Sequence, residues 1–293
     1  MKKLTGTLAD LTGFIRDSLK DIYPENEAGQ LAYLIVNHLL NYSKIDIHLK
    51  AGEKVSEDIF QQTHDIVRQL IENKPIQYIL GFTEFFGIML RVNHHVLIPR
   101  QETEELVDWI IKDHSGSHPV ILDIGTGSGS IAVALAKNLH GAVVHGIDNS
   151  AQALSLASEN AKINHVDIHY SLHDILDKQP FVHTARYNVI VSNPPYVTMS
   201  EKKLMKKNVT DYEPSAALYV SDNDPLVFYR KIAEFGLEHL DDHGSLYMEI
   251  NENFGAALVQ LYREKGYKDV ILRKDINGKD RMVKATMGPK RVL

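Results

Sequence analysis

The chain has 293 residues, which suits one large domain or two domains of ordinary size. Its formal net charge of -6 excludes a surface that is basic throughout, and leaves only a local lysine run at residues 202–207. Because the chain contains no cysteine, disulfides, thiolate metal ligands and cysteine nucleophiles are excluded. No apolar run has the length of a membrane span and no apolar leader follows Met1, so we expect a cytoplasmic protein.

Residues 1–80 are predicted to form a small all-α domain. Apolar residues recur at helical spacing from Leu8 to Ile22, again after Pro24, and again after Ser56, which is a suitable helix N-cap. The region has neither a glycine-rich loop nor the spacing of metal ligands. A bundle that only packs would explain it, and a domain that recognises a macromolecular substrate is the functional alternative.

Residues 81–95 are expected to form a β-hairpin, rich in aromatic residues and turning at Gly87, which connects the helical domain to a second domain over residues 96–293. Near the start of the second domain, acidic residues crowd the beginning of a helix, where they favour the positive end of the helix dipole. Arg100 and Glu102 in this stretch could line the mouth of a cofactor or substrate site. Ordinary helix capping would explain them equally well.

A glycine-rich turn follows the first buried strand of the second domain. The strand ends at Asp123, and the turn after it alternates glycine with small polar residues: Gly125, Thr126, Gly127, Ser128 and Gly129. Because glycine has no side chain, this backbone can approach a ligand closely. The alternation differs from the dinucleotide fingerprint G-x-G-x-x-G, and no phosphate-binding lysine follows, so the turn favours a ligand with a ribose and an adenine but no phosphate.

Two later acidic residues stand at strand ends, where ligand contacts are expected. Asp148 ends the second strand, 19 residues past Gly129, which is the offset at which a carboxylate reaches a ribose hydroxyl. Asp174 follows the third strand and is a candidate for binding the adenine amine, while a solvated turn aspartate is the alternative.

An apolar run over residues 187–192 leads directly into Asn193-Pro194-Pro195-Tyr196, the N-P-P-Y segment. The run predicts a strand buried on both faces of a parallel sheet, and the prolines end it because they cannot donate to a sheet ladder. Asn193 is therefore expected at the carboxyl end of a central strand, where ligands bind in such sheets. The Asn193 side-chain oxygen and the Pro194 carbonyl are two acceptors beside the flat ring of Tyr196, which suits a planar NH2 group.

Strands and helices alternate from residue 120 onward, which predicts an α/β fold with a mostly parallel sheet. Asn277-Gly278 lies between the last two strands and is a hairpin turn signal, so the last strand is expected to be antiparallel. Between residues 197 and 224 we expect a long polar loop that covers the site, followed by a helix with Pro225 at its first position. The 15 histidines are scattered without metal-ligand spacing, so no metal site is expected.

Taken together, the motifs resemble those of the class I S-adenosylmethionine-dependent methyltransferases and, more narrowly, the PrmC/HemK family of release factor glutamine methyltransferases. The resemblance covers nearly the whole chain and rests on residues 75–81, 85–87, 97–104, 123–129, 193–196 and 213–214. Two positions depart from the family pattern: Gln101 replaces a usual proline, and Ile175 stands where an aromatic residue often follows the position of Asp174.

This resemblance implies a Rossmann-like domain with a seven-stranded, mostly parallel sheet and an antiparallel last strand, joined to a small all-α substrate-recognition domain. It implies transfer of a methyl group from S-adenosyl-L-methionine, with S-adenosyl-L-homocysteine as the product. The acceptor would be the side-chain nitrogen N5 of the glutamine in the Gly-Gly-Gln motif of class I peptide chain release factors. Neither a membrane nor a direct nucleic-acid partner is expected.

The resemblance also implies which residues contact the two ligands. The methyl donor is expected to contact Asp123, Gly125, Thr126, Gly127, Ser128, Gly129, Asp148, Asp174, Ile175 and Asn193. The glutamine is expected to contact Asn193, Pro194, Pro195, Tyr196, Arg100 and Glu102, of which Asn193, Pro194 and Tyr196 would be catalytic.

Two other functions remain as alternatives. The N-P-P-Y segment alone also suits a DNA or RNA methyltransferase that acts on the amino group of adenine or guanine, and the acidic net charge disfavours this function. The third hypothesis is a non-catalytic binding protein that uses the helical domain as an adaptor. The intact glycine-rich turn and Asn193 disfavour it.

Overall fold

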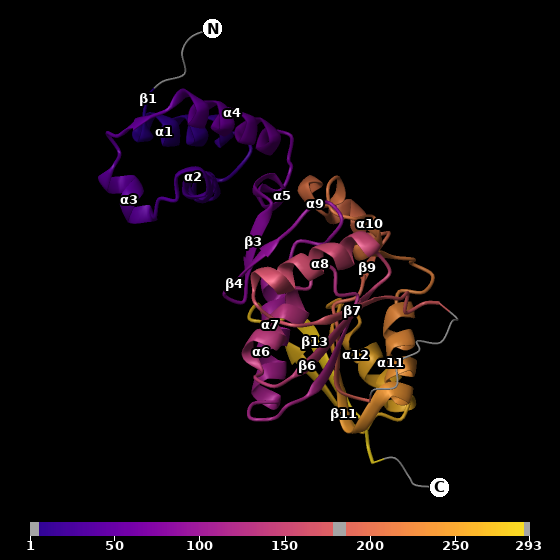
Figure 1. Cartoon of the computed structure of the whole chain (residues 1–293). Helices are drawn as coiled ribbons and strands as arrows, with labels where there is room; N and C mark the ends of the chain where they lie inside the picture. The colour runs from indigo at the N-terminus through magenta and orange to yellow at the C-terminus, as the bar shows by residue number, and fades with distance from the viewer. Residues whose placement is uncertain (1–5, 178–185, 290–293) are drawn as a thin grey trace. The chain divides into compact units, whose positions relative to one another are not determined.

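The computed structural model describes residues 6–177 and 186–289 (Figure 1). The described chain separates into two compact units. The first holds the residues up to Gly81 together with Lys207–Tyr212, and the second holds Phe82–Lys206 and the residues from Glu213 onward. Residues 1–5, 178–185 and 290–293, which belong to the predicted domains, lie outside the described residues.

The first unit consists of short helices around an apolar core. Its helices are α1 (Leu8–Leu19), α2 (Glu25–Leu40), α3 (Lys44–Leu49), α4 (Glu57–Ile71), α5 (Ile76–Leu80) and α9 (Lys207–Thr210). Leu11 and Ile15 are fully buried in the core, and the Ser56 side chain caps α4 by accepting a backbone N–H. The predicted all-α character is confirmed, with the addition of a two-residue ladder between β1 (Gly6–Thr7) and β2 (Lys54–Val55).

Residues 207–212 belong to the first unit, although their neighbours in sequence on both sides belong to the second. The Tyr212 hydroxyl donates a hydrogen bond of 2.7 Å to the backbone carbonyl of Glu72. The segment that follows N-P-P-Y in sequence thus contributes one short helix to the helical unit, which the amino-acid pattern did not predict.

The second unit is built on one sheet of seven strands. The strands are β5 (Val120–Ile124), β6 (Val143–Asp148), β7 (His169–Leu172), β8 (Tyr187–Ser192), β11 (Leu240–Glu249), β12 (Asp269–Lys274) and β13 (Asp280–Thr286). They lie in the order β12, β13, β11, β8, β5, β6, β7. All neighbouring pairs are parallel except those of β13, which runs antiparallel to both β11 and β12. The predicted fold class is therefore confirmed.

Apolar clusters on both faces of this sheet form the core of the second unit. The helices are α6 (Gln101–Asp113), α7 (Ser130–Asn138) and α8 (Ala151–Ile163) on one face, and α11 (Val227–His239) and α12 (Gly255–Glu264) on the other (Figure 1). In β8, Val189 and Val191 enter the first cluster and Ile190 enters the second. All three are fully buried, which confirms the central strand that the apolar run predicted.

The expected hairpin is present as β3 (Phe82–Phe85) and β4 (Ile88–Arg91). Its turn has positive φ angles at Phe86 and Gly87, of 47° and 72°, which is the geometry of the tight turns that hairpins favour. The Arg91 backbone donates to the Asn160 side chain on α8 over 2.7 Å, and the same Asn160 side chain donates back to the Arg91 carbonyl over 3.0 Å. By these contacts the hairpin is part of the second unit.

Two predictions about residues 197–227 were wrong, the absence of ordered elements and the start of the next helix. Pro214, Ala216 and Ala217 do line the cavity of the second unit, as expected of a segment that covers the site. The expected polar loop contains β9 (Val197–Thr198) paired in parallel with β10 (Tyr219–Val220), a short 3-10 helix, and α9 and α10 (Ser215–Leu218). The polar side chains that suggested a loop serve as anchors, since the Glu201 carboxylate accepts from both the backbone and the hydroxyl of Thr198. The next helix begins at Val227 instead of Pro225, because residues 224–226 form a separate turn before it.

Candidate active site

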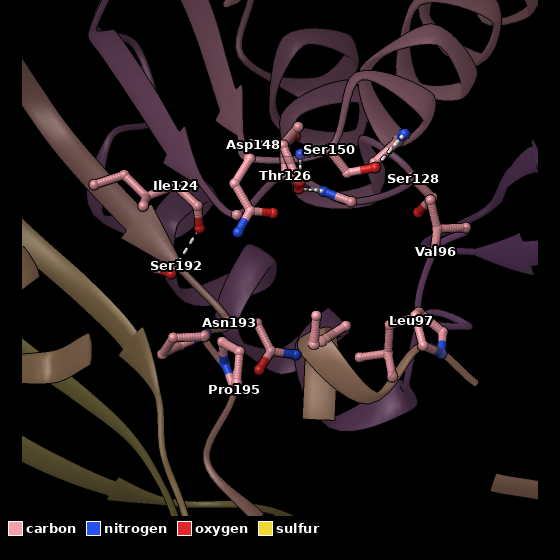
Figure 2. Close-up of a pocket in the computed structure, with 18 of the residues that line it drawn as sticks. Val96, Leu97, Ile124, Thr126, Ser128, Asp148, Ser150, Ser192, Asn193 and Pro195 are labelled. Carbon is pink, nitrogen blue, oxygen red and sulfur yellow. Dashed lines mark hydrogen bonds between the residues drawn. The ribbon is translucent and has the colours of Figure 1, made fainter. Parts of the chain in front are cut away.

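A cavity of about 300 Å³ opens at the carboxyl ends of β5, β6 and β8, where ligands bind in open α/β sheets. In Figure 2, Thr126, Asp148 and Ser150 lie on one side of the open space, Asn193 and Pro195 on the opposite side, and Leu97 near a third side. All the residues that line the cavity belong to the second unit.

The glycine-rich turn forms one wall of the cavity. Gly125, Gly127 and Gly129 have φ angles of 71°, 54° and 80°, a region that other residues rarely adopt. Gly125 and Gly127 line the cavity together with Thr126 and Ser128. A Cβ at Gly129 would come within 2.8 Å of the Tyr170 hydroxyl, so this glycine allows close packing behind the wall.

Asp148 lies at the end of β6 and also lines the cavity. Its Oδ2 accepts the backbone N–H of Gly127 over 2.8 Å, and its Oδ1 accepts that of Ser150 over 2.9 Å. Burial raises the pKa of Asp148, while these hydrogen bonds favour its charged form. Each oxygen keeps a second lone pair, so the carboxylate can still accept from ligand hydroxyls.

Asp123 is buried behind the turn and, in the described part of the chain, is not among the lining residues. The Thr126 hydroxyl donates to its Oδ2 over 2.6 Å. Burial raises the pKa of Asp123 to about 7. The contact that the structure shows for this carboxylate is with the turn itself, and a direct contact with a ligand stays a prediction.

Asp174 and Ile175 line the cavity on the side of β7. The Asp174 Oδ1 accepts the backbone N–H of Leu176 over 2.8 Å, which is the local hydrogen bond of a turn aspartate. The position of Asp174 is compatible with an aspartate that binds an adenine amine and also with an ordinary turn aspartate. The predicted contact with an adenine stays a prediction.

Asn193 directly follows β8, as expected, and lines the cavity with Pro194 and Pro195. Its side-chain nitrogen donates to the Thr103 hydroxyl oxygen over 3.1 Å. The hydroxyl of Thr103 in turn donates to Oε2 of Glu249 over 2.5 Å. Because the nitrogen is engaged in this way, the side-chain oxygen of Asn193 is the atom that remains to accept from a ligand.

Tyr196 is placed differently from Asn193. Within the described residues it is not among those that line the cavity, and its ring packs against the apolar cluster on the side of α11 and α12. Its hydroxyl donates to Oε1 of Glu249 over 2.9 Å. Burial raises the pKa of Tyr196 well above its ordinary value, so the phenol stays protonated. The stacking role of this ring stays a prediction.

Arg100 and Glu102 differ in their relation to the cavity. Arg100 lines the cavity, and its guanidinium forms an ion pair of 2.6 Å with Glu213, whose side chain is almost completely buried. Glu213 also accepts the backbone N–H of Ile98 over 3.3 Å. This pair holds the segment before α6 against the segment that leads into α10. Glu102 is not a lining residue in the described chain, while its neighbour Thr103 is.

Two residues were not predicted from the sequence: Thr103, which lines the cavity, and Glu249, which is hydrogen bonded to it. Glu249 ends β11, and the same rule that selected Asp123 and Asp148, a carboxylate at the end of a parallel strand, would have selected it. The parallel pairing of Met248 with Ser192 puts Glu249 beside Asn193. For Thr103 the sequence carries no signal, because a threonine in the first turn of a helix is ordinary.

Among the described residues, no group of three or more histidine and acidic side chains is arranged to hold a metal ion. Within the same residues, no helix combines the length and the apolar character that crossing a bilayer requires.

Comparisons with known proteins cover most of the chain. The PrmC N-terminal domain family matches residues 11–81, and the Methyltransferase small domain family matches residues 102–217. The chain is 46% identical over 277 residues to a release factor glutamine methyltransferase of Flavobacterium psychrophilum, covering 93% of this chain and 96% of that protein. It is 44% identical to one of Bacteroides thetaiotaomicron, covering 94% and 98%.

Among solved structures, the hMettl16 catalytic domain in complex with the MAT2A 3'UTR hairpin 6 superposes with a TM-score of 0.54. The match covers 83% of this chain and 86% of that one at 15% sequence identity. At this identity the likeness concerns the fold alone.

Proposed function

The chain belongs to the family of release factor glutamine methyltransferases, and from this premise we propose how its cavity performs the reaction. It is an S-adenosylmethionine-dependent methyltransferase that modifies a glutamine side chain of a peptide chain release factor. We further propose that the acceptor atom is N5 of the glutamine in the Gly-Gly-Gln motif of class I release factors. Because release factors work on the ribosome, the enzyme is proposed to act in the cytoplasm.

The cavity residues fit S-adenosylmethionine. Gly125 and Gly127 leave the wall free of side chains, and Asp148 offers two oxygens for the ribose hydroxyls. Within the described lining there is no lysine, and the single arginine, Arg100, is paired with Glu213, which suits a ligand without phosphate. When bound, S-adenosylmethionine supplies an activated methyl group on a sulfonium.

The chain's own contribution to the chemistry is to orient the acceptor nitrogen. An amide nitrogen is a poor nucleophile because its lone pair is shared with the carbonyl, and Asn193 is no base. Asn193 can accept one N–H of the glutamine amide through Oδ1, and the Pro194 carbonyl can accept the other. This holds the lone pair toward the donor, and near-ideal alignment is worth about 7–11 kcal/mol. The same two oxygens stabilise the positive charge that develops on the nitrogen, until the methylated amide releases one of its two N–H protons to solvent.

The single observation that carries this mechanism is the hydrogen bond from Asn193 to Thr103, because it leaves the Asn193 oxygen as the acceptor. The test is an assay with labelled methyl donor and purified release factor. We expect label on the factor and none on a factor whose Gly-Gly-Gln glutamine is replaced by alanine. Equal labelling of both factors would overturn the assignment of the Gly-Gly-Gln glutamine as the acceptor. Transfer to added adenine-containing oligonucleotides instead would favour the nucleic-acid alternative.

We propose that the helical unit recognises the body of the release factor. In support, α3 has no buried residue, and its Ile45 and Leu49 side chains, on one face of the helix, are 71% and 77% exposed.

In a variant that carries Ile45→Ser and Leu49→Ser, KM for the intact factor should rise about tenfold, as expected when apolar anchors are lost. Turnover of a short peptide with the Gly-Gly-Gln motif should not change. Ile276→Ser, at an exposed apolar residue of the second unit, is the matched control. An unchanged KM for the factor would remove α3 from the recognition surface.

A further inference from the structure

We propose that Glu249 and Thr103 are positioning residues that fix which way the Asn193 amide faces, and that this orientation sets the rate of methyl transfer. The inference rests on the proposed function of Asn193. Glu249 is 1% exposed and ends β11, which pairs in parallel with β8. Two hydrogen bonds join it to Asn193 through the Thr103 hydroxyl.

The single proton of the Thr103 hydroxyl decides which way the Asn193 amide faces. That hydroxyl lies 2.5 Å from Glu249 Oε2. Burial raises the pKa of Glu249, while the hydroxyl donors Thr103 and Tyr196 and the positive charge of Arg281 favour its ionised form. An ionised carboxylate can only accept, so the proton of Thr103 points to Glu249. The Thr103 oxygen can therefore only accept from Asn193, which must present its NH2 group. If the Asn193 amide turned by 180°, its carbonyl oxygen would face lone pairs of Thr103 without a proton between them. A turned amide would also present two N–H donors to the glutamine instead of an acceptor.

The other oxygen of the same carboxylate holds the far end of N-P-P-Y. Glu249 Oε1 accepts the hydroxyl of Tyr196 over 2.9 Å. The Asn251 side chain donates to the Tyr196 backbone carbonyl over 3.2 Å. One buried carboxylate thus holds both ends of N-P-P-Y, Asn193 through Thr103 and Tyr196 directly. The Pro194 carbonyl lies between these two fixed points, so both proposed acceptors depend on Glu249.

Glu249 is not itself among the lining residues in the described chain. It makes its two side-chain hydrogen bonds to hydroxyl groups and has no ion pair within the described residues. Burying a carboxylate in this way is costly unless each oxygen is hydrogen bonded. Glu249 therefore acts on the reaction through the two hydroxyl groups that it orients, those of Thr103 and Tyr196.

The test compares Thr103→Val with Thr103→Ser in the full-length enzyme. Valine has nearly the shape of threonine but removes both hydrogen bonds, while serine keeps the hydroxyl. We expect kcat with the release factor to fall about 100-fold in Thr103→Val, as for a misplaced reacting group. The dissociation constant for S-adenosylmethionine, measured by calorimetry, should stay within about threefold, and Thr103→Ser should keep kcat within about fivefold.

A second readout needs no release factor. With asparagine labelled in its side-chain nitrogen, the Asn193 NH2 resonances are assigned by their loss in Asn193→Ala. In the parent and in Thr103→Ser, one of the two protons should exchange slowly with water, and in Thr103→Val it should exchange at least about tenfold faster. Glu249→Gln should also speed this exchange, because a glutamine cannot accept from Thr103 and Tyr196 through two oxygens.

The outcomes separate the two proposals. Unchanged exchange and unchanged kcat in Thr103→Val would overturn the positioning role. Equal losses in the valine and serine variants, accompanied by lower melting temperatures in both, would reduce Thr103 to a packing residue and also overturn it. If the exchange changes as expected while the parent enzyme labels no release factor, the positioning role stands and the proposed function fails.

Discussion

The two sides of the cavity are built by different means. On the side of β5 and β6 the wall is mostly backbone, with glycines at positive φ and a carboxylate, Asp148, that accepts backbone N–H groups. On the side of β8 the wall depends on side chains, since Asn193 is held by Thr103 and Thr103 by Glu249. The first side is therefore shaped to receive a ligand, whereas the second is shaped to orient one functional group.

The half-buried carboxylate of Asp148 and the buried carboxylate of Glu249 show the same contrast. Burial raises the pKa of both Asp148 and Glu249. Asp148 lines the cavity and is held by the loops beside it, so it is available to a ligand. Glu249 lies behind the wall, and hydroxyl groups occupy both of its oxygens. Substitutions on the two sides are therefore expected to separate binding of the methyl donor from turnover.

The largest effect is expected from Asn193→Ala. Removing the acceptor that orients the glutamine amide should lower kcat by about 100- to 1000-fold, as loss of one preorganised polar group does in other active sites. The affinity for S-adenosylmethionine should change far less. Single-turnover kinetics and calorimetry measure the two quantities. If donor affinity fell in step with turnover, Asn193 would be chiefly a donor-binding residue and the contrast between the two sides would disappear.

The converse pattern is expected from Asp148→Asn. The substitution removes a charged acceptor and puts an N–H group where Gly127 or Ser150 now donates. Loss of charged hydrogen bonds of this kind costs about 1.5–3 kcal/mol, so the dissociation constant for S-adenosylmethionine should rise about 10- to 150-fold. At saturating donor, kcat should stay near that of the parent. A fall in kcat that saturating donor does not restore would contradict the assignment of this side to binding.

The smallest effect is expected from Asp123→Asn, and it concerns stability. The pKa of Asp123 is about 7 in the folded protein, against an ordinary value of 3.8. Between these values the folded state binds a proton that the unfolded chain has released, so this group's contribution to stability is lost as pH rises toward 7. In the Asp123→Asn variant this side chain does not titrate, so it causes no fall in stability as pH rises. Its melting temperature relative to the parent should therefore increase between about pH 4 and about pH 7 and stay level above that.

The control for this measurement is Asp167→Asn, which changes an exposed aspartate. It should show no such trend. A difference between Asp123→Asn and the parent that is the same at every pH would mean that folding does not shift the pKa of Asp123. The Thr126 hydrogen bond would then offset the cost of burial.

Local patterns predicted most of the architecture and several of the residues that line the cavity. Asn193 was placed at a strand end by the apolar run before it and the prolines after it. Both signals act on the backbone within a few residues, so they can be recognised without the fold. The glycine-rich turn and Asp148 were recognisable for the same reason. The ordered elements within residues 197–224 were missed, since their polar side chains are paired with distant partners such as Asn251.

The amino-acid sequence by itself determined where the strands end and which residues stand at those ends, because hydrophobic alternation, glycine and proline act locally. The tertiary structure alone decided that Glu249 stands behind Asn193. Thr103 and Glu249 are 146 positions apart, and Asn193 and Thr103 are 90 apart. The hydrogen bonds among them form only when β8 and β11 pair and α6 packs on the sheet, and no pattern along the chain encodes that approach.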